Sequence, residues 1–184
     1  MNLSVITVTW NSANLIAEQI KSVAAGCRNL IFEEIIVDNG STDSTAEIIE
    51  KQFSQVRFIK SNKNLGFAGA NNMAAKLAQG EFLLFLNPDM RIELGSLDTI
   101  VEWMQRNPQV GLASCKLVDE HGELNGDAQP RRFPTVWDQL AIILKLPHIF
   151  PQITDHYLFK DFKPDVEQEV DSVRGSFMLM RREV

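Results

Sequence analysis

Short apolar runs alternate with helix-like segments through the first 120 residues, and this alternation restricts the fold more than any other feature of the chain. In the helical segments, apolar residues recur at i, i+3, i+4 and i+7, which places them on one face of a helix. Strands joined by helices in this way form a parallel sheet with helices on both faces. The sequence therefore predicts an α/β fold with a Rossmann-like, mostly parallel sheet flanked by helices. The expected strands are Leu3–Thr9, Glu34–Val37, Val56–Ser61, Glu81–Leu86 and Val110–Val118.

The helices between these strands carry recognisable end signals. A helix over Ser44–Phe53 has Ser44 and Glu47 at the spacing of a capping box, in which each side chain bonds the backbone N–H of the other residue. Ser96 is expected as the N-cap of a later helix, because serine readily accepts a bond from a first-turn N–H. The remaining expected ends are a start at Asn11 or Ser12 and stops at Gly26 and Gly80.

After about residue 120 the pattern loosens. Asn125–Thr135 is predicted as a loop, Val136–Leu146 as a short helix, and Gln168–Arg182 as strand-like. Pro147–Glu167 has no clear period and is assigned no element. Its aromatic side chains favour a satellite core over a sugar-binding platform; they are Phe150, Tyr157, Phe159 and Phe162.

Composition limits the class of protein. With 184 residues and 45% hydrophobic content, the chain can bury one substantial core, so a single domain over residues 1–184 is expected. The net charge of −6 supplies no basic surface, and we expect no nucleic-acid partner. Cys27 and Cys115 are expected as free thiols of a reducing compartment. No signal peptide and no apolar run of roughly 18 residues is recognised, so a cytoplasmic location is expected.

Two of the expected strands lead into carboxylates. Asp38 ends the run Ile35–Val37, and Asp89 follows the run Phe82–Leu86. In open α/β sheets, ligands bind at this carboxyl edge. The residues alone leave a second interpretation open, in which Asp38 only caps the next helix and Asn-Pro-Asp only forms a turn.

The two carboxylates suit different tasks. The βα turns lack both Gly-x-Gly-x-x-Gly and a Gly-Lys-Ser/Thr loop, so neither a Rossmann dehydrogenase nor a P-loop NTPase is indicated. A metal on a strand-end carboxylate can hold phosphate instead, because Mg²⁺ or Mn²⁺ takes one or two carboxylates together with phosphate oxygens. Asp89 is the candidate ligand. An ionised Asp38 can only accept hydrogen bonds, which suits the N3–H of uracil or thymine and disfavours cytosine.

Two further stretches lie where a nucleotide could bind. Asn64–Asn72 is a loop of small residues that feeds a helix N-terminus, where backbone N–H groups and the helix dipole favour a diphosphate. Small residues also allow tight packing of a helix on a sheet, and that alternative stays open. Thr9-Trp10-Asn11 ends the first strand, where the tryptophan is either a ligand contact or part of the core.

Together, Thr9-Trp10-Asn11, Asp38-Asn39-Gly40-Ser41, Asn64-Leu65-Gly66 and Asn87-Pro88-Asp89 resemble the nucleotide-sugar domain of family 2 glycosyltransferases, which have the GT-A fold. The residues of these motifs are most similar to those of the rhamnosyltransferase-like branch. The resemblance implies that Asp89 binds Mg²⁺ or Mn²⁺. Two positions depart from the family pattern, which often has a second aspartate at Asn39 and arginine at Asn71. At Asn87 the family has either aspartate or asparagine. The implied nucleotide-binding residues are Val8, Thr9, Trp10, Asn11, Asp38, Asn39, Asn64, Gly66, Asn71 and Asn87.

The resemblance also implies an activity: metal-assisted, inverting transfer of a sugar in cell-envelope polysaccharide synthesis. The implied donor is dTDP-rhamnose, with a UDP-hexose second, and the acceptor is a saccharide or a lipid-linked saccharide. Peripheral association with the inner face of the membrane is compatible with such an acceptor.

Similar enzymes continue into Gly-Gly-Phe-Asp-Glu and a Glu-Asp pair that supplies the catalytic base, and this sequence has neither. We therefore expect an N-terminal portion, truncated at its C-terminal end, and assign no catalytic residue. Two other functions are considered. A sugar-phosphate nucleotidyltransferase would need a glycine-rich, arginine-bearing start, which Thr7–Asn14 lacks. A non-catalytic nucleotide-sugar-binding module stays open.

Overall fold

The computed structural model describes residues 1–119, 121–124 and 129–184. The chain forms two compact units, one comprising Met1–Ala113 with Gly175–Val184 and the other Ser114–Arg174. The first, larger unit holds the sheet, and the second unit holds short helices and turns. Residues 125–128 of the predicted loop Asn125–Thr135 lie outside the described residues.

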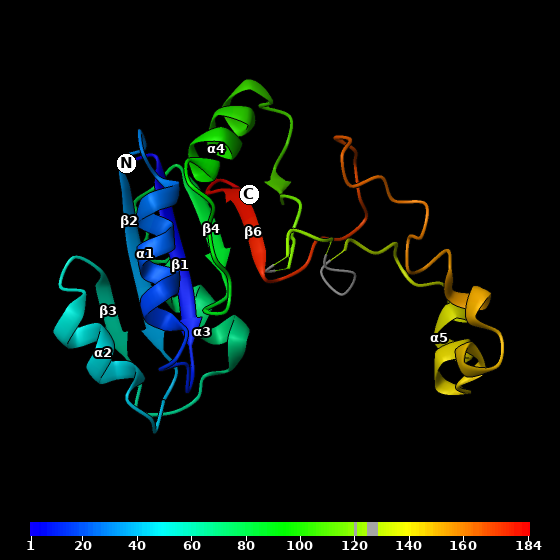
Figure 1. Cartoon of the computed structure of the whole chain (residues 1–184), viewed down its shortest axis with the longest axis horizontal. Helices are drawn as coiled ribbons and strands as arrows, with labels where there is room; N and C mark the ends of the chain where they lie inside the picture. The colour runs from blue at the N-terminus through cyan, green and yellow to red at the C-terminus, as the bar shows by residue number, and fades with distance from the viewer. Residues whose placement is uncertain (120, 125–128) are drawn as a thin grey trace. The chain divides into compact units, whose positions relative to one another are not determined.

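In the described residues, the larger unit contains a six-stranded sheet with the order β3-β2-β1-β4-β6-β5 (Figure 1). The strands are β1 (Leu3–Thr9), β2 (Phe32–Asp38), β3 (Arg57–Lys60), β4 (Phe82–Leu86), β5 (Leu112–Ala113) and β6 (Phe177–Arg181). β3, β2, β1 and β4 are parallel, whereas β6 is antiparallel to both of its neighbours. The predicted α/β fold with a mostly parallel sheet is therefore confirmed.

Helices cover both faces of this sheet. Within the described residues of the larger unit they are α1 (Ile16–Gly26), α2 (Thr45–Gln52), α3 (Gly66–Ala75) and α4 (Ser96–Arg106). Successive side chains of β2 point to opposite faces, as strand geometry requires. Ile35 and Val37 pack with Ala70 and Ala74 of α3, whereas Ile36 packs with buried residues of α1 and α2. The layer of α1 and α2 and the layer of α3 thus lie on opposite sides of the sheet (Figure 1).

The strand order reverses beside β1, and this reversal positions the candidate site. From β1 the chain adds β2 and β3 on one side, and the connection through α3 then returns it to the other side, where β4 pairs with β1. Ligands of open α/β sheets bind at the carboxyl ends of the strands that flank such a reversal. These ends are Thr9 of β1 and Leu86 of β4, and Asp38 is paired with Thr9. The fold therefore brings both predicted strand-end carboxylates to one sheet edge.

The start of α1 differs from the prediction. The helix begins at Ile16 rather than at Asn11 or Ser12. The backbone of Ser12 donates to the Thr45 hydroxyl (2.8 Å), so the chain after β1 first bonds to the segment that opens α2. This long-range contact delays the helix by about one turn.

The predicted capping box of α2 and the predicted N-cap of α4 were also wrong. Ser44 is the N-cap of α2 but makes no side-chain cap bond, and Glu47 instead pairs with Lys51 one turn later (2.5 Å). In α4 the N-cap is Gly95, with a left-handed φ of 73°, and Ser96 is the first helical residue. A glycine adopts this conformation without steric cost, which moves the cap one position earlier.

Two further ends are earlier than predicted. α3 ends at Ala75, and Gly80 serves close packing instead, because a Cβ there would lie 2.5 Å from the backbone nitrogen of Ser4. The predicted strand Val110–Val118 is reduced to Leu112–Ala113, since the chain enters the second unit at Ser114.

The second unit contains α5 (Val136–Ile143) and the 3₁₀ turns η2 (Leu146–His148) and η3 (Pro151–Thr154). α5 begins with a capping box between Thr135 and Asp138. It ends before the predicted Leu146, because Lys145 takes a left-handed φ of 55°. Of the predicted strand-like stretch Gln168–Arg182, only β6 of the larger unit is a strand.

The aromatic side chains of the second unit form a satellite core only in part. Phe159 is buried, its ring lies 5.5 Å from that of Phe162, and the Arg132 guanidinium stacks over it at 4.6 Å. The Arg131 guanidinium lies 5.4 Å from the centre of the Tyr157 ring. Phe150, in contrast, is exposed, so the prediction fails at this position.

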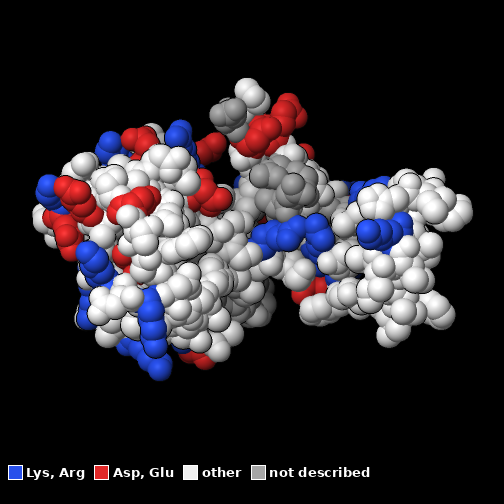
Figure 2. Space-filling view, turned by 90° about the horizontal axis from the view of Figure 1, so that it is seen from below, with Lys and Arg blue, Asp and Glu red and all other residues white. Residues whose placement is uncertain are grey.

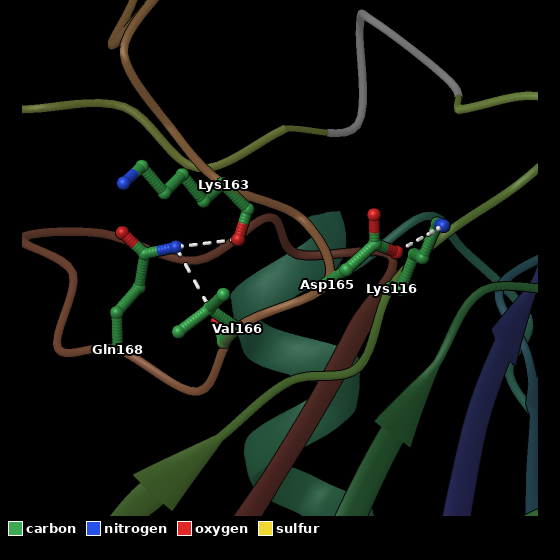
Figure 3. A network of polar contacts seen from close by, with 5 residues as sticks. All are labelled: Lys116, Lys163, Asp165, Val166 and Gln168. Carbon is green, nitrogen blue, oxygen red and sulfur yellow. Dashed lines mark hydrogen bonds and ion pairs between the residues drawn. The ribbon is translucent and has the colours of Figure 1, made fainter.

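Polar contacts close the turn at residues 163–168 (Figure 3). The Gln168 amide donates to the backbone carbonyls of Lys163 (2.7 Å) and Val166 (3.4 Å). Lys116 and Asp165 form an ion pair at 2.7 Å, with the Asp165 side chain largely exposed. Exposed pairs of this kind contribute between zero and about 1 kcal/mol, so this pair adds little to the stability of the unit.

Candidate active site

The loops after β1 and β2 are bonded to each other at the carboxyl edge of the sheet. The backbone N–H of Asn11 donates to the Ser41 hydroxyl (2.8 Å), and the backbone N–H of Thr42 donates to the Asn11 side-chain oxygen (2.8 Å). Asn11 has a left-handed φ of 50°, a conformation that asparagine adopts more readily than most residues. Asn11 is thus used to join two loops.

A second bridge between these loops runs through Asp43. Its carboxylate accepts from the backbone N–H of Ala13 (3.1 Å) and from the Thr45 hydroxyl (2.5 Å). The hydrogen bond from the Thr45 hydroxyl lowers the pKa of Asp43, so this carboxylate is ionised at neutral pH. Neither Asp43 nor Ser41 was among the predicted site residues, because their contacts reach about thirty residues along the chain.

Trp10 directly follows β1, and it is 56% exposed. The interpretation of Trp10 as a core residue is therefore wrong. Val8, two positions earlier, packs against the hydrophobic cluster under α3. A ligand at this edge can therefore meet the exposed indole of Trp10, whereas the Val8 side chain is partly buried.

Asp38 is the last residue of β2 and is completely buried. Its carboxylate accepts from the Ser41 hydroxyl and from the Ser41 backbone N–H (3.3 Å). On the neighbouring strand, the buried Thr9 hydroxyl has no hydrogen-bond partner among the described residues. Burying a hydroxyl without a hydrogen bond costs about 1–3 kcal/mol. This edge therefore contains a hydroxyl group that no described residue of the protein satisfies.

Two asparagines join the loop after β3 to the loop after β2. The Asn39 amide oxygen accepts from the Leu65 N–H (2.7 Å), and the Asn39 amide nitrogen donates to the Asn64 side-chain oxygen (3.0 Å). The same Asn64 oxygen accepts from the Gly66 N–H (2.8 Å). Gly40 lies so close that a Cβ there, on a φ of +83°, would meet the Lys63 backbone at 3.1 Å. Asn39 and Asn64 thereby hold the start of α3 at the sheet edge.

The first turn of α3 is open to solvent, with Gly66 and Phe67 both exposed. Asn71, one turn later, is buried, and its amide donates to the backbone carbonyl of Phe67 (3.0 Å). The backbone of this turn is thus accessible to an anion, whereas the Asn71 side chain is engaged within its own helix. A role of Asn71 in nucleotide binding stays a prediction.

Asn87-Pro88-Asp89 forms a turn directly after β4. The backbone N–H of Met90 donates to the Asn87 carbonyl (3.2 Å), and the Asn87 N–H donates to the Ser176 carbonyl (3.1 Å). Asn87 is half-buried and Asp89 is exposed. Turn formation therefore presents the Asp89 carboxylate at the edge, and Ser176, which precedes β6, is a neighbour that sequence reasoning did not assign to the site.

The described residues contain no group of three or more His, Cys, Asp or Glu side chains that could hold a metal ion. The edge beside β4 offers the Asp89 carboxylate and the neutral side-chain oxygen of Asn87. Such a donor set is insufficient for a metal cage made by protein alone. It fits a magnesium-like ion that takes most of its oxygen ligands from phosphate and water.

This fold, with polar loops at the strand-order reversal, is that of a GT-A glycosyltransferase. The chain belongs to glycosyltransferase family 2, because the model of the family described as Glycosyl transferase family 2 matches residues 4–184. The rhamnosyltransferase-like branch stays a prediction.

Two curated relatives illustrate the similarity. The O-antigen biosynthesis protein RfbC of Myxococcus xanthus is 35% identical over 123 residues, which are 65% of this chain and 10% of that protein. The poly(ribitol-phosphate) beta-N-acetylglucosaminyltransferase TarS of Staphylococcus aureus is 37% identical over 127 residues, which are 66% of this chain and 22% of that protein. The chain thus spans less than a quarter of the length of these relatives.

Solved structures agree with the fold. TarS residues 1–349 in complex with UDP-GlcNAc superpose with a TM-score of 0.57 at 29% identity, over 71% of this chain and 39% of that one. The mannosyltransferase PcManGT from Pyrobaculum calidifontis, in complex with GDP-Man and Mn²⁺, has a TM-score of 0.63 at 20% identity, over 99% of this chain and 45% of that one. At that identity, the second similarity shows the fold alone.

Proposed function

We propose that the chain is the donor-binding part of a glycosyltransferase that acts in cell-envelope polysaccharide synthesis. The observation that carries the proposal is the placement of Asp38, Trp10 and Asp89 at the carboxyl ends of β2, β1 and β4, beside the reversal of strand order. The names of two relatives, an O-antigen biosynthesis protein and a poly(ribitol-phosphate) beta-N-acetylglucosaminyltransferase, support the cell envelope as the setting. The acceptor is then a saccharide or a lipid-linked saccharide.

The proposed donor is a sugar linked to a pyrimidine nucleoside diphosphate. The complexes of TarS with UDP and with UDP-GlcNAc support UDP. The motifs Asp38-Asn39-Gly40-Ser41 and Asn87-Pro88-Asp89 resemble those of the rhamnosyltransferase-like branch, and this resemblance supports dTDP-rhamnose. Uracil and thymine share the N3–H donor, so one carboxylate serves both alternatives.

Base recognition falls to Asp38 and Trp10. For the N3–H to reach Asp38, the Ser41 hydroxyl has to turn away from the carboxylate that it covers. The exposed indole of Trp10 supplies a flat surface on which a base can stack. The neighbouring loops are fixed by the bridges through Asn11 and Asp43, so the indole is held at the edge before the ligand arrives.

The diphosphate is expected between the first turn of α3 and Asp89. The exposed N–H groups of that turn favour negative charge. Asp89, with the Asn87 oxygen, would hold Mg²⁺ or Mn²⁺ mainly when phosphate oxygens complete the ligand shell. When bound, the ion would neutralise charge on the departing diphosphate. Transfer by a single inverting displacement requires a base that deprotonates the acceptor, and no described residue is assigned to that role.

Isothermal titration calorimetry of the 184-residue chain with UDP, dTDP and CDP tests this proposal. UDP or dTDP should bind at least about tenfold more tightly than CDP, which corresponds to roughly 1.4 kcal/mol. Mn²⁺ should raise the affinity for UDP, and Asp89→Asn should abolish this increase. Equal affinities for CDP and UDP would contradict the role of Asp38.

Glu50→Gln is the matched control, since it removes an exposed carboxylate of α2. Its UDP affinity and its response to Mn²⁺ should equal those of the unmodified chain. An unchanged Mn²⁺ response in Asp89→Asn would show that the metal lies elsewhere. Asn87→Ala should reduce the response less than Asp89→Asn, because a neutral oxygen is a weaker ligand than a carboxylate.

A further inference from the structure

Helix α5 carries its apolar stripe on the outside of the second unit. Side chains at i, i+1, i+4, i+7 and i+8 share one face of a helix. Those of α5 and its C-cap on this face are all exposed: Val136, Trp137, Leu140, Ile143 and Leu144. The opposite face, with Asp138 and Ala141, is buried. The orientation is therefore the reverse of that expected for a helix on the surface of a globular unit.

The exposed apolar surface extends beyond α5. In the described residues, ten of the 21 exposed large hydrophobic side chains lie within residues 133–153. Ile149 and Phe150, between η2 and η3, are each at least 60% exposed. Apolar patches of this extent mark contacts with another molecule or with a membrane.

Between Asp138, which is buried, and Asp155, the charges of this patch have one sign. From Gln139 to Thr154 the sequence contains no aspartate or glutamate, although the whole chain has a net charge of −6. Lys145 and His148, both exposed, lie within this stretch. In Figure 2 the part of the second unit around α5 is mostly white with basic side chains, whereas the visible face of the larger unit mixes both signs. The surface therefore fits an apolar partner that carries negative charge.

We propose that residues 136–154 of the second unit form a membrane-contact surface for anionic lipids. The apolar side chains would enter the boundary between headgroups and acyl chains, Lys145 would face the phosphates, and the indole of Trp137 would lie at headgroup depth, where tryptophan is enriched. None of the described helices has the length and hydrophobicity to cross a membrane. In this proposal the segment lies along the membrane surface.

A lipid surface explains the charges better than a second copy of the chain. A symmetric dimer places the same patch on both sides of its interface, so Lys145 and His148 of two copies would share an apolar interface without counter-charges. Anionic headgroups supply these counter-charges over an extended plane, and each basic residue near such a surface strengthens binding.

Co-sedimentation with vesicles, in the absence of nucleotide, tests the surface separately from sugar transfer. At low ionic strength, binding to phosphatidylcholine vesicles that contain phosphatidylglycerol should be at least about tenfold stronger than to phosphatidylcholine alone, and salt should reduce the difference. The double variant Trp137→Ser/Ile143→Ser should lose at least about tenfold in partition. Lys145→Glu should weaken binding to the anionic vesicles only.

The matched control is Ile31→Ser/Leu94→Ser, which removes two apolar side chains of the larger unit that are about as exposed. It should retain vesicle binding within about twofold. Far-UV circular dichroism and UDP titration should be unchanged in all variants. Three results would each overturn the proposal: absence of vesicle binding, equal loss in the control, or a dimer in sedimentation equilibrium that only Trp137→Ser/Ile143→Ser dissolves.

Discussion

Helix α1 of the larger unit and helix α5 of the second unit both carry an apolar stripe, but the protein covers only the stripe of α1. Ile16, Ile20 and Val23 of α1 are at most 1% exposed, whereas Trp137 and Ile143 of α5 are 79% and 71% exposed. Helical periodicity therefore predicts that a helix has an apolar face, but it does not identify what covers that face.

The polar contacts described for the two units also differ in how deeply their side chains are buried. At the sheet edge, buried or half-buried side chains such as Asn39 bond to backbone groups more than twenty residues away. In the second unit, the ion pairs Arg132–Asp161 and Lys116–Asp165 each include an aspartate that is more than 70% exposed. The loops at the sheet edge are thus joined by buried or half-buried bonds, whereas these two exposed ion pairs of the second unit contribute little to its stability.

Replacing one isoleucine of each stripe by alanine should give the largest difference between the two helices. Ile20→Ala should lower the free energy of unfolding by about 2–5 kcal/mol, because it removes buried methyl groups and leaves a cavity. Ile143→Ala makes the same chemical change on an exposed face and should alter it by less than about 0.5 kcal/mol. Urea unfolding followed by circular dichroism measures both. A large loss in Ile143→Ala would mean that the α5 stripe is covered in solution by the chain itself or by a second copy.

A buried carboxyl gives the larger unit a pH dependence of its own. Glu34 of β2 is 5% exposed. Burial raises the pKa of its carboxyl to about 8, although a hydrogen bond with Gln19 acts in the opposite direction. The pKa of Glu34 in the folded protein lies above its unfolded value of 4.5. Its contribution to stability is therefore fully present below pH 4.5 and is lost as the pH rises through about 8. Stability should therefore fall between these pH values, by up to about 5 kcal/mol in total.

Glu34→Gln should flatten this decline and make the protein more stable than the unmodified chain at pH 8. Thermal melts at a series of pH values measure the effect. The control Glu50→Gln, at an exposed position of α2, should keep the decline. If Glu34→Gln kept it too, the decline would come from another group.

Local sequence patterns predicted the fold where each residue's environment is set by its own element. The runs that became β1, β2 and β4 are buried by helices on both faces, so their apolar character identified them directly. Element ends were less predictable, because they depend on distant residues. The start of α1 is delayed by the bond from Ser12 to Thr45, and Gly80 meets the backbone of Ser4.

The candidate site shows the same division. Asp38 and Asp89 could be placed at the sheet edge from the strands that precede them, and the structure places both there. The hydrogen bond from the Ser41 hydroxyl to Asp38 and the bond from the Asn87 N–H to the Ser176 carbonyl could not be predicted from the sequence. These contacts exist only after strands from different parts of the sequence have been aligned in the sheet.

The smallest expected effect concerns the start of α5, where the contrast with Glu34 reverses in sign. Hydrogen bonds from Thr135, first from its hydroxyl, lower the pKa of Asp138 below its ordinary value of 3.8. The ionised carboxylate therefore stabilises the cap above that value, and this contribution is lost as pH falls through the lower, folded pKa. α5 has eight residues and an exposed apolar face, so its cap supplies a larger share of its stability than a cap does in α1. Amide hydrogen exchange, corrected for the intrinsic pH dependence, should show that α5 loses protection below pH 3.8 while α1 keeps it. Asp138→Asn, whose amide oxygen can still accept from Thr135, should make the protection of α5 independent of pH. If α5 in this variant lost protection on acidification as the unmodified chain does, the carboxylate at the cap would not be the group that titrates.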